Sequence, residues 1–166
     1  QQRVTRLACA IAREMDLPEK TVEMIEVAGI LHDIGKIGVP AEILNKPGCL
    51  SELEMNLIRE HSRMGYEILK KVPFDGPVAD IVLQHHERVN GTGSPRRLKD
   101  GKIMREAKIL AVADVVEAMA SHRPYRPAHG IGKALAEIRQ NKGVLYDKCA
   151  ANACLRIFNR GGFSFN

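Results

Sequence analysis

The sequence predicts an all-α protein, a bundle of about seven helices. Apolar residues recur at intervals of three and four in one segment after another, which is the period of an α-helix with one face in a core. No segment keeps the strict alternation of a half-buried strand, and turns rich in glycine and proline separate the helical segments. The 166 residues suffice for one core, so we expect a single domain over residues 1–166.

The composition is that of an ordinary soluble globular protein. Hydrophobic residues make up 45% and charged residues 27% of the chain. No apolar run approaches the roughly 18 residues of a membrane-spanning helix, and no signal peptide is evident, so we expect a cytoplasmic protein without a membrane segment. The net charge of +5 comes from scattered basic residues, which indicates a solvated surface and argues against a face that binds a DNA or RNA duplex.

The cysteines show no Cys-x-x-Cys spacing. They are typical of small buried hydrophobic residues in a reducing cytoplasm, and not of a disulfide framework or a zinc site. This expectation covers Cys9, Cys49, Cys149 and Cys154.

The first two helices are predicted by apolar stripes near the start of the chain. No capping residue precedes the first stripe, so we expect the chain to be part of a longer protein, truncated at its N-terminus. Pro18 suits the first turn of the second helix, which should end at Gly35. The first stripe contains Val4, Leu7, Ala8, Ile11 and Met15, and the second contains Val22, Ile25, Ala28, Gly29 and His32.

The middle of the chain begins with a short helix or turn over residues 41–44 and a turn at Lys46-Pro47-Gly48. Ser51 and Glu54 have the spacing of a capping box, which starts the third long helix, and Pro73 ends it. The inward stripe of this helix is predicted to contain Leu57, Ile58, His61, Met64, Gly65, Ile68 and Leu69.

The fourth helix opens after Asp75-Gly76-Pro77, and the fifth follows the turn at Asp100-Gly101. The last two helices are expected at residues 131–140 and, from a cap at Asp147, at residues 147–158. The inward stripe is Val78, Ile81, Val82, His85 and His86 on the fourth helix, and Ala107, Leu110, Ala111, Asp114 and Ala118 on the fifth.

Four of these helices place imidazoles or carboxylates on the face that should be buried. Burying such a group is costly unless something pairs with it. One histidine on an apolar face is more often a core residue with a structural hydrogen bond than a ligand. Four such coincidences are less expected than one shared site. The set is His32, Asp33, His61, His85, His86 and Asp114.

The ligand types indicate which ions this site would hold. Imidazoles and carboxylates without thiolates suit Fe, Mn, Zn, Ni or Mg, and not a structural zinc of the cysteine type. Six ligands exceed the need of one tetrahedral ion, so two ions fit better, with Asp33 as the bridge. Two ions about 3.5–4 Å apart can clamp a phosphodiester and hold a hydroxide for in-line attack.

Taken together, these motifs resemble the HD-GYP domains, a branch of the HD superfamily of metal-dependent phosphohydrolases. The resemblance implies an HD-domain-like helical bundle that hydrolyses the bacterial second messenger cyclic di-GMP to pGpG or GMP. It also implies two or three divalent ions, most often iron or manganese. It covers nearly the whole chain and rests on residues 31–37, Lys46-Pro47-Gly48, Glu60-His61 with Gly65, His85-His86-Glu87, residues 90–95, Ala113-Asp114 and Arg123-Pro124-Tyr125-Arg126.

The resemblance implies a role for each matching residue. Asp33 would bridge the metals, and Lys36 would contact a phosphate oxygen and offset charge in the transition state. Arg123 and Arg126 would hold the phosphates of the ligand. The alternative is a solvated helix end, but the neighbouring prolines stiffen the segment and favour the phosphate role. The metal ligands would be His32, Asp33, His61, His85, His86 and Asp114.

Two departures from the family pattern bear on function. The family's Gly-Tyr-Pro reads Gly93-Ser94-Pro95, and Ser94 offers no ring for stacking on a base. Stacking contributes about 1–3 kcal/mol where it has been tested, so the affinity for cyclic di-GMP could fall tenfold or more. The histidine with which the family begins its first helix would stand immediately before Gln1, and the acidic ligand of a third metal would lie further upstream.

Three interpretations follow from the sequence. The first is a phosphodiesterase acting on cyclic di-GMP. The second keeps the chemistry but changes the substrate to pGpG or another nucleotide, such as cyclic GMP-AMP. The third is a degenerate domain that binds a nucleotide or a protein. GGDEF-type or other signalling proteins are expected as partners, and an exposed apolar helix face would allow a homodimer.

Overall fold

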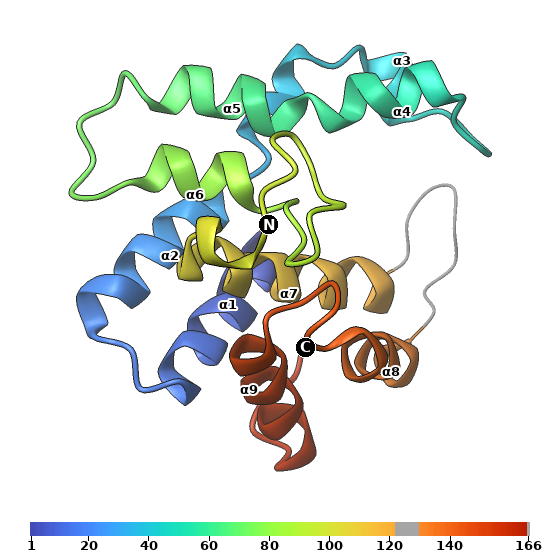
Figure 1. Cartoon of the computed structure of the whole chain (residues 1–166). Helices are drawn as coiled ribbons and strands as arrows, with labels where there is room; N and C mark the ends of the chain where they lie inside the picture. The colour runs from blue at the N-terminus through green and yellow to red at the C-terminus, as the bar shows by residue number, and fades with distance from the viewer. Residues whose placement is uncertain (122–129, 166) are drawn as a thin grey trace.

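The computed structural model describes residues 1–121 and 130–165, and within these ranges the fold is all-α, as predicted (Figure 1). The β-structure in these ranges consists of two isolated β-bridges. The α-helices are α1 (Gln2–Glu14), α2 (Glu19–Leu31), α3 (Ala41–Leu44), α4 (Glu52–Arg59), α5 (His61–Leu69), α6 (Val78–Gln84), α7 (Arg105–Ala120), α8 (Ile131–Asn141) and α9 (Lys148–Asn159); the 3₁₀-helices are η1 (Ile34–Gly38) and η2 (Asp100–Lys102).

The described part of the chain has nine α-helices where the sequence predicted about seven, for two reasons. The short segment at residues 41–44 is a helical turn, and the third long helix divides at Glu60 into α4 and α5. The capping box is confirmed, because the Ser51 hydroxyl accepts from the Glu54 amide at 3.3 Å and the Glu54 carboxylate accepts from the Ser51 amide at 2.8 Å. The predicted cap at Asp147 also forms, onto the amide of Ala150 at 2.9 Å.

The break at Glu60 makes part of the predicted inward stripe wrong. Leu57 is 45% exposed and Ile68 is 43% exposed. The helix α4 buries none of its residues, since it extends beyond the helices that form the core. Its apolar side chains are therefore available to line a surface pocket.

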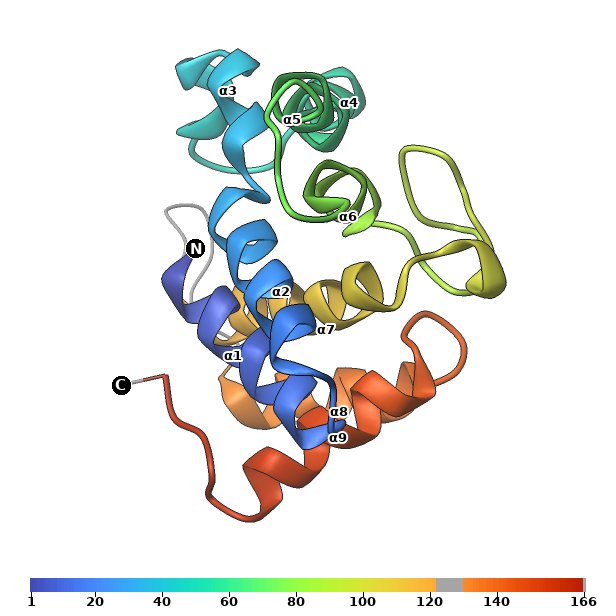
Figure 2. The ribbon, with the colours of Figure 1, turned by 90° about the vertical axis from the view of Figure 1, so that its left-hand side faces the viewer.

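The core lies around α1, which packs against α2, α7 and α9 (Figure 2). Leu7 and Ile11 of α1 are completely buried, and so are Ile109 and Leu110 of α7. Figure 2 shows α3, α4 and α5 at one end of the molecule and α8 and α9 at the other, with α1, α2 and α7 between them. The inward faces of α2, α5, α6 and α7 thereby come close to one another above the core.

A close backbone approach fixes the position of η1 against α5. A Cβ atom at Gly35 would lie 1.9 Å from the carbonyl oxygen of His61 and 2.5 Å from the amide nitrogen of Gly65. Only glycine leaves room for this contact. The residues on either side of Gly35 are thus held beside the start of α5.

The cysteine prediction is only partly right. Cys9 and Cys154 are buried, but Cys49 and Cys149 are exposed. Cys49 lies in the turn before α4, and Cys149 lies on the outer face of α9, so neither reaches the core. Burial raises the pKa of Cys9 to about 11 and the pKa of Cys154 to about 12.

None of the helices in residues 1–121 and 130–165 combines the length and the apolar character that crossing a bilayer requires.

Candidate metal centre

The six predicted ligands come from the ends or inner faces of four helices. His32 follows the last residue of α2, and Asp33 precedes η1. His61 is the first residue of α5, while His85 and His86 follow α6 directly. Asp114 lies on α7. The second helix was predicted to run to Gly35, but it ends at Leu31, because the chain tightens there into η1.

The structure brings all six side chains into one cluster, which we call the metal-site cluster. The Nε2 atom of His32 lies 3.6 Å from Asp33 Oδ2 and 4.0 Å from Asp114 Oδ1. The Nε2 atom of His61 lies 3.5 Å from Asp33 Oδ1. On the other side, His86 Nδ1 lies 3.9 Å from Asp114 Oδ2. Asp33 and Asp114 therefore each stand between two imidazoles.

The histidines also contact one another. His61 Nε2 and His85 Nε2 are 3.4 Å apart, and the ring centroids of His85 and His86 are 4.0 Å apart. One nitrogen from each of these three imidazoles lies within 4.8 Å of the others. Several nitrogen donors at this spacing suit a shared metal ion.

Backbone carbonyls fix the orientation of three of these rings. The Nδ1 atoms of His32, His61 and His85 lie 2.6, 2.5 and 2.5 Å from the carbonyl oxygens of the residues three positions before them. A carbonyl oxygen can only accept, so each Nδ1 carries the proton. The unprotonated Nε2 atoms then point into the cluster. Such a carbonyl contact is the usual outer support of a metal-binding histidine.

This arrangement fits a cation and is poorly satisfied without one. In neutral imidazoles bonded in this way, the facing Nε2 atoms of His61 and His85 are both acceptors, and no proton joins them. His85 is completely buried, so water offers little compensation. A positive ion between the two nitrogens would satisfy both.

The surroundings favour the neutral form of His61, His85 and His86, which is the form that binds metal. Burial lowers the pKa of His61, and burial together with the neighbouring imidazoles lowers the pKa of His85 and His86 well below 6.5. Burial acts to raise the pKa of Asp33, but attraction by His32 and Lys36 outweighs it, and the pKa is lowered from 3.8.

Lys36 lies at the edge of the cluster. Its Nζ atom is 2.8 Å from Asp33 Oδ2 and equally 2.8 Å from Asp33 Oδ1. The side chain is about one third exposed, at 32%. The ammonium group therefore faces both the cluster and the solvent, where a phosphate could reach it.

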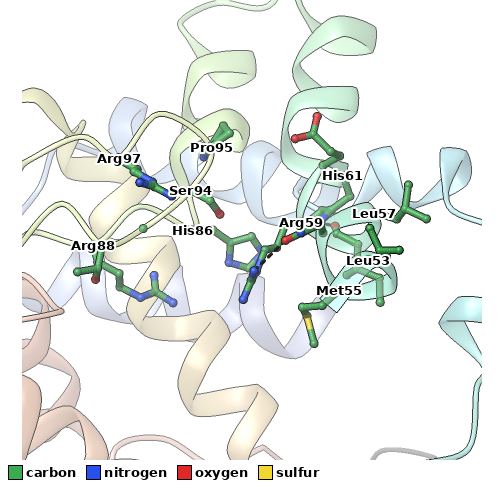
Figure 3. Close-up of a pocket in the computed structure, with 15 residues that line it drawn as sticks. Leu53, Met55, Leu57, Arg59, His61, His86, Arg88, Ser94, Pro95 and Arg97 are labelled. Atoms are coloured by element: carbon green, nitrogen blue, oxygen red, sulfur yellow. Dashed lines mark hydrogen bonds between the residues drawn. The ribbon is translucent and has the colours of Figure 1, made fainter. Parts of the chain in front are cut away.

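An open pocket of about 1030 Å³ lies beside the cluster (Figure 3). Figure 3 shows Leu53, Met55 and Leu57 of α4 on one side and the loop that carries Ser94 on the other, with His86 between them. His61 and His86 thus belong both to the cluster and to the pocket. The lining is Leu53, Met55, Asn56, Leu57, Ile58, Arg59, Glu60, His61, His86, Arg88, Thr92, Gly93, Ser94, Pro95 and Arg97.

The structure places Ser94 in this pocket wall, and its amide donates to the carbonyl of His86 at 3.2 Å. Arg123 and Arg126 lie outside the described residues. Three arginines of the pocket were not among the predicted site residues: Arg59, Arg88 and Arg97. A signal existed for two of them, since Arg59 and Arg88 each stand two residues from a predicted histidine ligand.

Comparison with known proteins agrees with this geometry. The HD domain family matches residues 1–149. The cyclic di-GMP phosphodiesterase response regulator RpfG of Xanthomonas campestris is 43% identical over 157 residues, which cover 93% of this chain and 42% of that protein. A cyclic di-GMP phosphodiesterase of Thermotoga maritima is 41% identical over 160 residues, or 94% of this chain and 43% of that protein.

Other similar proteins carry different substrate names. The 3′3′-cGAMP-specific phosphodiesterase 3 of Vibrio cholerae is 36% identical over 146 residues, covering 88% of this chain and 32% of that protein. Among solved structures, the HD-GYP-type protein Bd1817 of Bdellovibrio bacteriovorus is similar in fold. It aligns with a TM-score of 0.77 at 20% identity, over 95% of this chain and 50% of the chain of Bd1817. This structural likeness shows the fold alone.

The chain spans less than half the length of these curated relatives, 42% of one and 43% of another. Its match to the family, in contrast, extends over most of its own length, from residue 1 to residue 149. The chain therefore belongs to the HD domain family and is similar to the HD-GYP cyclic di-GMP phosphodiesterases.

Proposed function

We propose that this chain binds two divalent metal ions in the metal-site cluster and hydrolyses cyclic di-GMP to pGpG or GMP. The observation that carries the proposal is the inward orientation of imidazole nitrogens from separate helices around two carboxylates. The names of the relatives support the substrate class. The proposed ligands are His32, Asp33, His61, His85, His86 and Asp114, with Asp33 as the bridge.

Iron or manganese is the expected metal, with zinc, nickel or magnesium as alternatives. The ligand set contains nitrogen and oxygen donors and no thiolate, which suits all of these ions. When bound, the ions would supply an activated water and stabilise negative charge on the phosphate. A third ion would need ligands beyond these six.

The chain's own residues would bind and orient the substrate. Lys36 lies at the cluster with an exposed face, so it would neutralise charge on a non-bridging phosphate oxygen. The pocket is large enough for a nucleotide, and Arg59, Arg88 and Arg97 give it a positive lining. Arg123 and Arg126 remain proposed phosphate contacts.

One residue of the pocket wall supports a second candidate substrate. Ser94 replaces the tyrosine of the family motif, and a serine cannot stack on guanine. Relatives at 36% identity are named as specific for 3′3′-cGAMP. Hydrolysis of cyclic GMP-AMP is therefore the second candidate. The expected cytoplasmic location, the GGDEF-type partners and the homodimer belong to the same proposal.

Incubation with cyclic di-GMP and with 3′3′-cGAMP tests the proposal. The purified chain is loaded with Mn²⁺ or Fe²⁺ anaerobically, and linear products are separated by chromatography. We expect metal-dependent hydrolysis of at least one substrate, abolished by a chelator. Asp33→Ala should lose metal and activity while circular dichroism shows intact helices, and the exposed Asp75→Ala serves as control. A metal-loaded wild type that leaves both substrates intact contradicts the proposal.

A further inference from the structure

We propose that Glu87 is a positioning residue that holds the substrate-facing loop at residues 90–98 against the metal-site cluster. This inference rests on the proposed function, because it concerns the pocket in which the substrate would lie. Glu87 follows directly after the two imidazoles of His85 and His86, yet it does not face the cluster. Its carboxylate points to the loop instead.

The carboxylate is buried and bonded on both oxygens. Glu87 is 3% exposed. Its Oε1 atom accepts from the amide of Arg96 at 2.7 Å, and its Oε2 atom accepts from the amide of Leu98 at 2.9 Å. Hydrogen bonds to a charged acceptor are stronger than neutral ones, and two of them offset part of the cost of burial. Glu87 therefore fixes the second half of the loop, residues 95–98, which we call its returning arm.

The tip of the loop packs on the backbone around Glu87. A Cβ atom at Gly93 would lie 2.4 Å from the Cα atom of Glu87 and 2.3 Å from the amide nitrogen of Arg88. The next residue, Ser94, donates its amide to the carbonyl of His86. The tip can therefore occupy this position only with glycine and only while the loop stays folded back.

The base of the loop is closed independently of Glu87. Asn90 and Lys99 form an isolated antiparallel bridge, and the amide of Asp100 donates to the carbonyl of Val89 at 3.1 Å. The Asn90 side chain accepts from the amide of Thr92 at 3.0 Å. Loss of Glu87 should therefore loosen the arm at residues 95–98 and leave the rest of the loop closed.

The pocket-lining residues Ser94, Pro95 and Arg97 all lie between or beside these anchor points. Glu87 thus sets the distance from this pocket wall to His86. The hydrogen bonds of its carboxylate go to the amides of Arg96 and Leu98 and not to a side chain of the cluster. We expect substrate affinity to depend on Glu87, while the metal stays bound.

The substitution Glu87→Gln tests the inference, because it removes the charge and leaves the size of the side chain almost unchanged. The amide NH₂ group cannot accept, so one of the two backbone donors loses its partner. Amide hydrogen exchange of residues 96–98 should become about tenfold faster, as expected for loss of one bond to a charged acceptor. The KM for the hydrolysed dinucleotide should rise by a similar factor, about tenfold, with a smaller change in kcat and the same metal content.

Three variants complete the experiment. Glu23→Gln makes the same change at an exposed position of α2 and should alter neither exchange nor KM. Gly93→Ala displaces the loop tip by a different route and should raise KM. Glu87→Asp keeps the charge but is one methylene shorter, and it replaces Glu87→Gln if that variant does not fold.

Each outcome decides the inference. Unchanged exchange at Arg96 and Leu98 in the Glu87 variant overturns the anchor, whatever the activity. Faster exchange with an unchanged KM overturns the positioning role, and loss of metal would show that Glu87 acts through the cluster instead. If the wild type hydrolyses no dinucleotide, the proposed function fails, and exchange alone then supports or overturns the anchor.

Discussion

The Nε2 atoms of His61 and His85 face each other at 3.4 Å, although both rings already use their Nδ1 protons on backbone carbonyls. Two buried acceptors at this distance need a positive partner. A proton is disfavoured there, because burial lowers the pKa of both imidazoles. This pair of nitrogens is therefore the strongest geometric argument for a metal ion.

Removing one of these nitrogens should abolish most of the stabilisation of the fold by added metal. In the wild type, Mn²⁺ at a hundredfold excess over its dissociation constant should stabilise the fold by about 2.7 kcal/mol, which raises Tm by roughly 5–10 °C. In His85→Ala we expect Mn²⁺ to raise Tm by less than about 2 °C under the same conditions. Because stabilisation by a ligand depends on its concentration relative to its dissociation constant, so small a rise would indicate much weaker metal binding. Differential scanning calorimetry with and without Mn²⁺ measures the difference.

The buried Cys154→Ala provides the matched control for this experiment. It should lower the baseline Tm through lost packing, yet keep the full rise with Mn²⁺. An undiminished rise in His85→Ala would show that the ion binds elsewhere.

Lys36 should act on catalysis and not on metal loading. Replacing it with methionine removes the ammonium beside Asp33 and should lower kcat by about 100-fold, the usual effect of losing one stabilising donor. Lys36→Arg should recover part of the rate. The exposed Lys20→Met is the control. Steady-state kinetics and elemental analysis test this together, and a Lys36→Met protein that turns over normally would exclude the role.

Without metal, the stability of the fold should decrease as the pH falls below about 6.5. Burial lowers the pKa of His61, His85 and His86 from 6.5, so the unfolded chain binds more protons than the folded one below that pH. Each imidazole can contribute a slope of up to about 1.4 kcal/mol per pH unit. The lowered pKa of Asp33 acts only below 3.8, outside this range.

Urea unfolding from pH 8 to pH 5 in the presence of a chelator measures this dependence. The free energy of unfolding should be nearly constant above pH 7 and should fall below pH 6.5, and His85→Ala should have a shallower slope. Stability that rises towards pH 5 would mean that the imidazoles are charged in the folded protein.

Two of the four thiols should react in the native protein. Cys49 and Cys149 are exposed, whereas burial raises the pKa of Cys9 to about 11 and of Cys154 to about 12. The buried thiols are therefore protonated and shielded at pH 8. Titration with a disulfide reagent should show two fast thiols, and four after denaturation. Cys49→Ser should remove one fast thiol; four fast thiols in the folded protein would contradict the burial pattern.

Helical periodicity predicted the cluster well, because spacing alone decides which face a side chain shares. His61 and His85 lie on stripes whose neighbours are apolar, and both are buried. The same logic failed at Leu57, since the break at Glu60 carries no glycine or proline. Glu60 itself has helical angles, φ −68° and ψ −12°, so nothing local marks it as the end of α4.

The anchor at Glu87 could not be predicted for another reason. A carboxylate after two histidines resembles either a ligand or a solvated charge, and the sequence cannot distinguish these from a third role. Its partners are the backbone amides of Arg96 and Leu98, which every residue type except proline provides. Only the folded loop brings those amides to the carboxylate.

Anomalous X-ray scattering from crystals soaked in Mn²⁺ tests the metal centre most directly. We predict two manganese peaks about 3.5–4 Å apart, each within about 2.0–2.3 Å of imidazole or carboxylate atoms of the cluster, with Asp33 between them. A map with no manganese peak next to His61 and His85 would contradict the account.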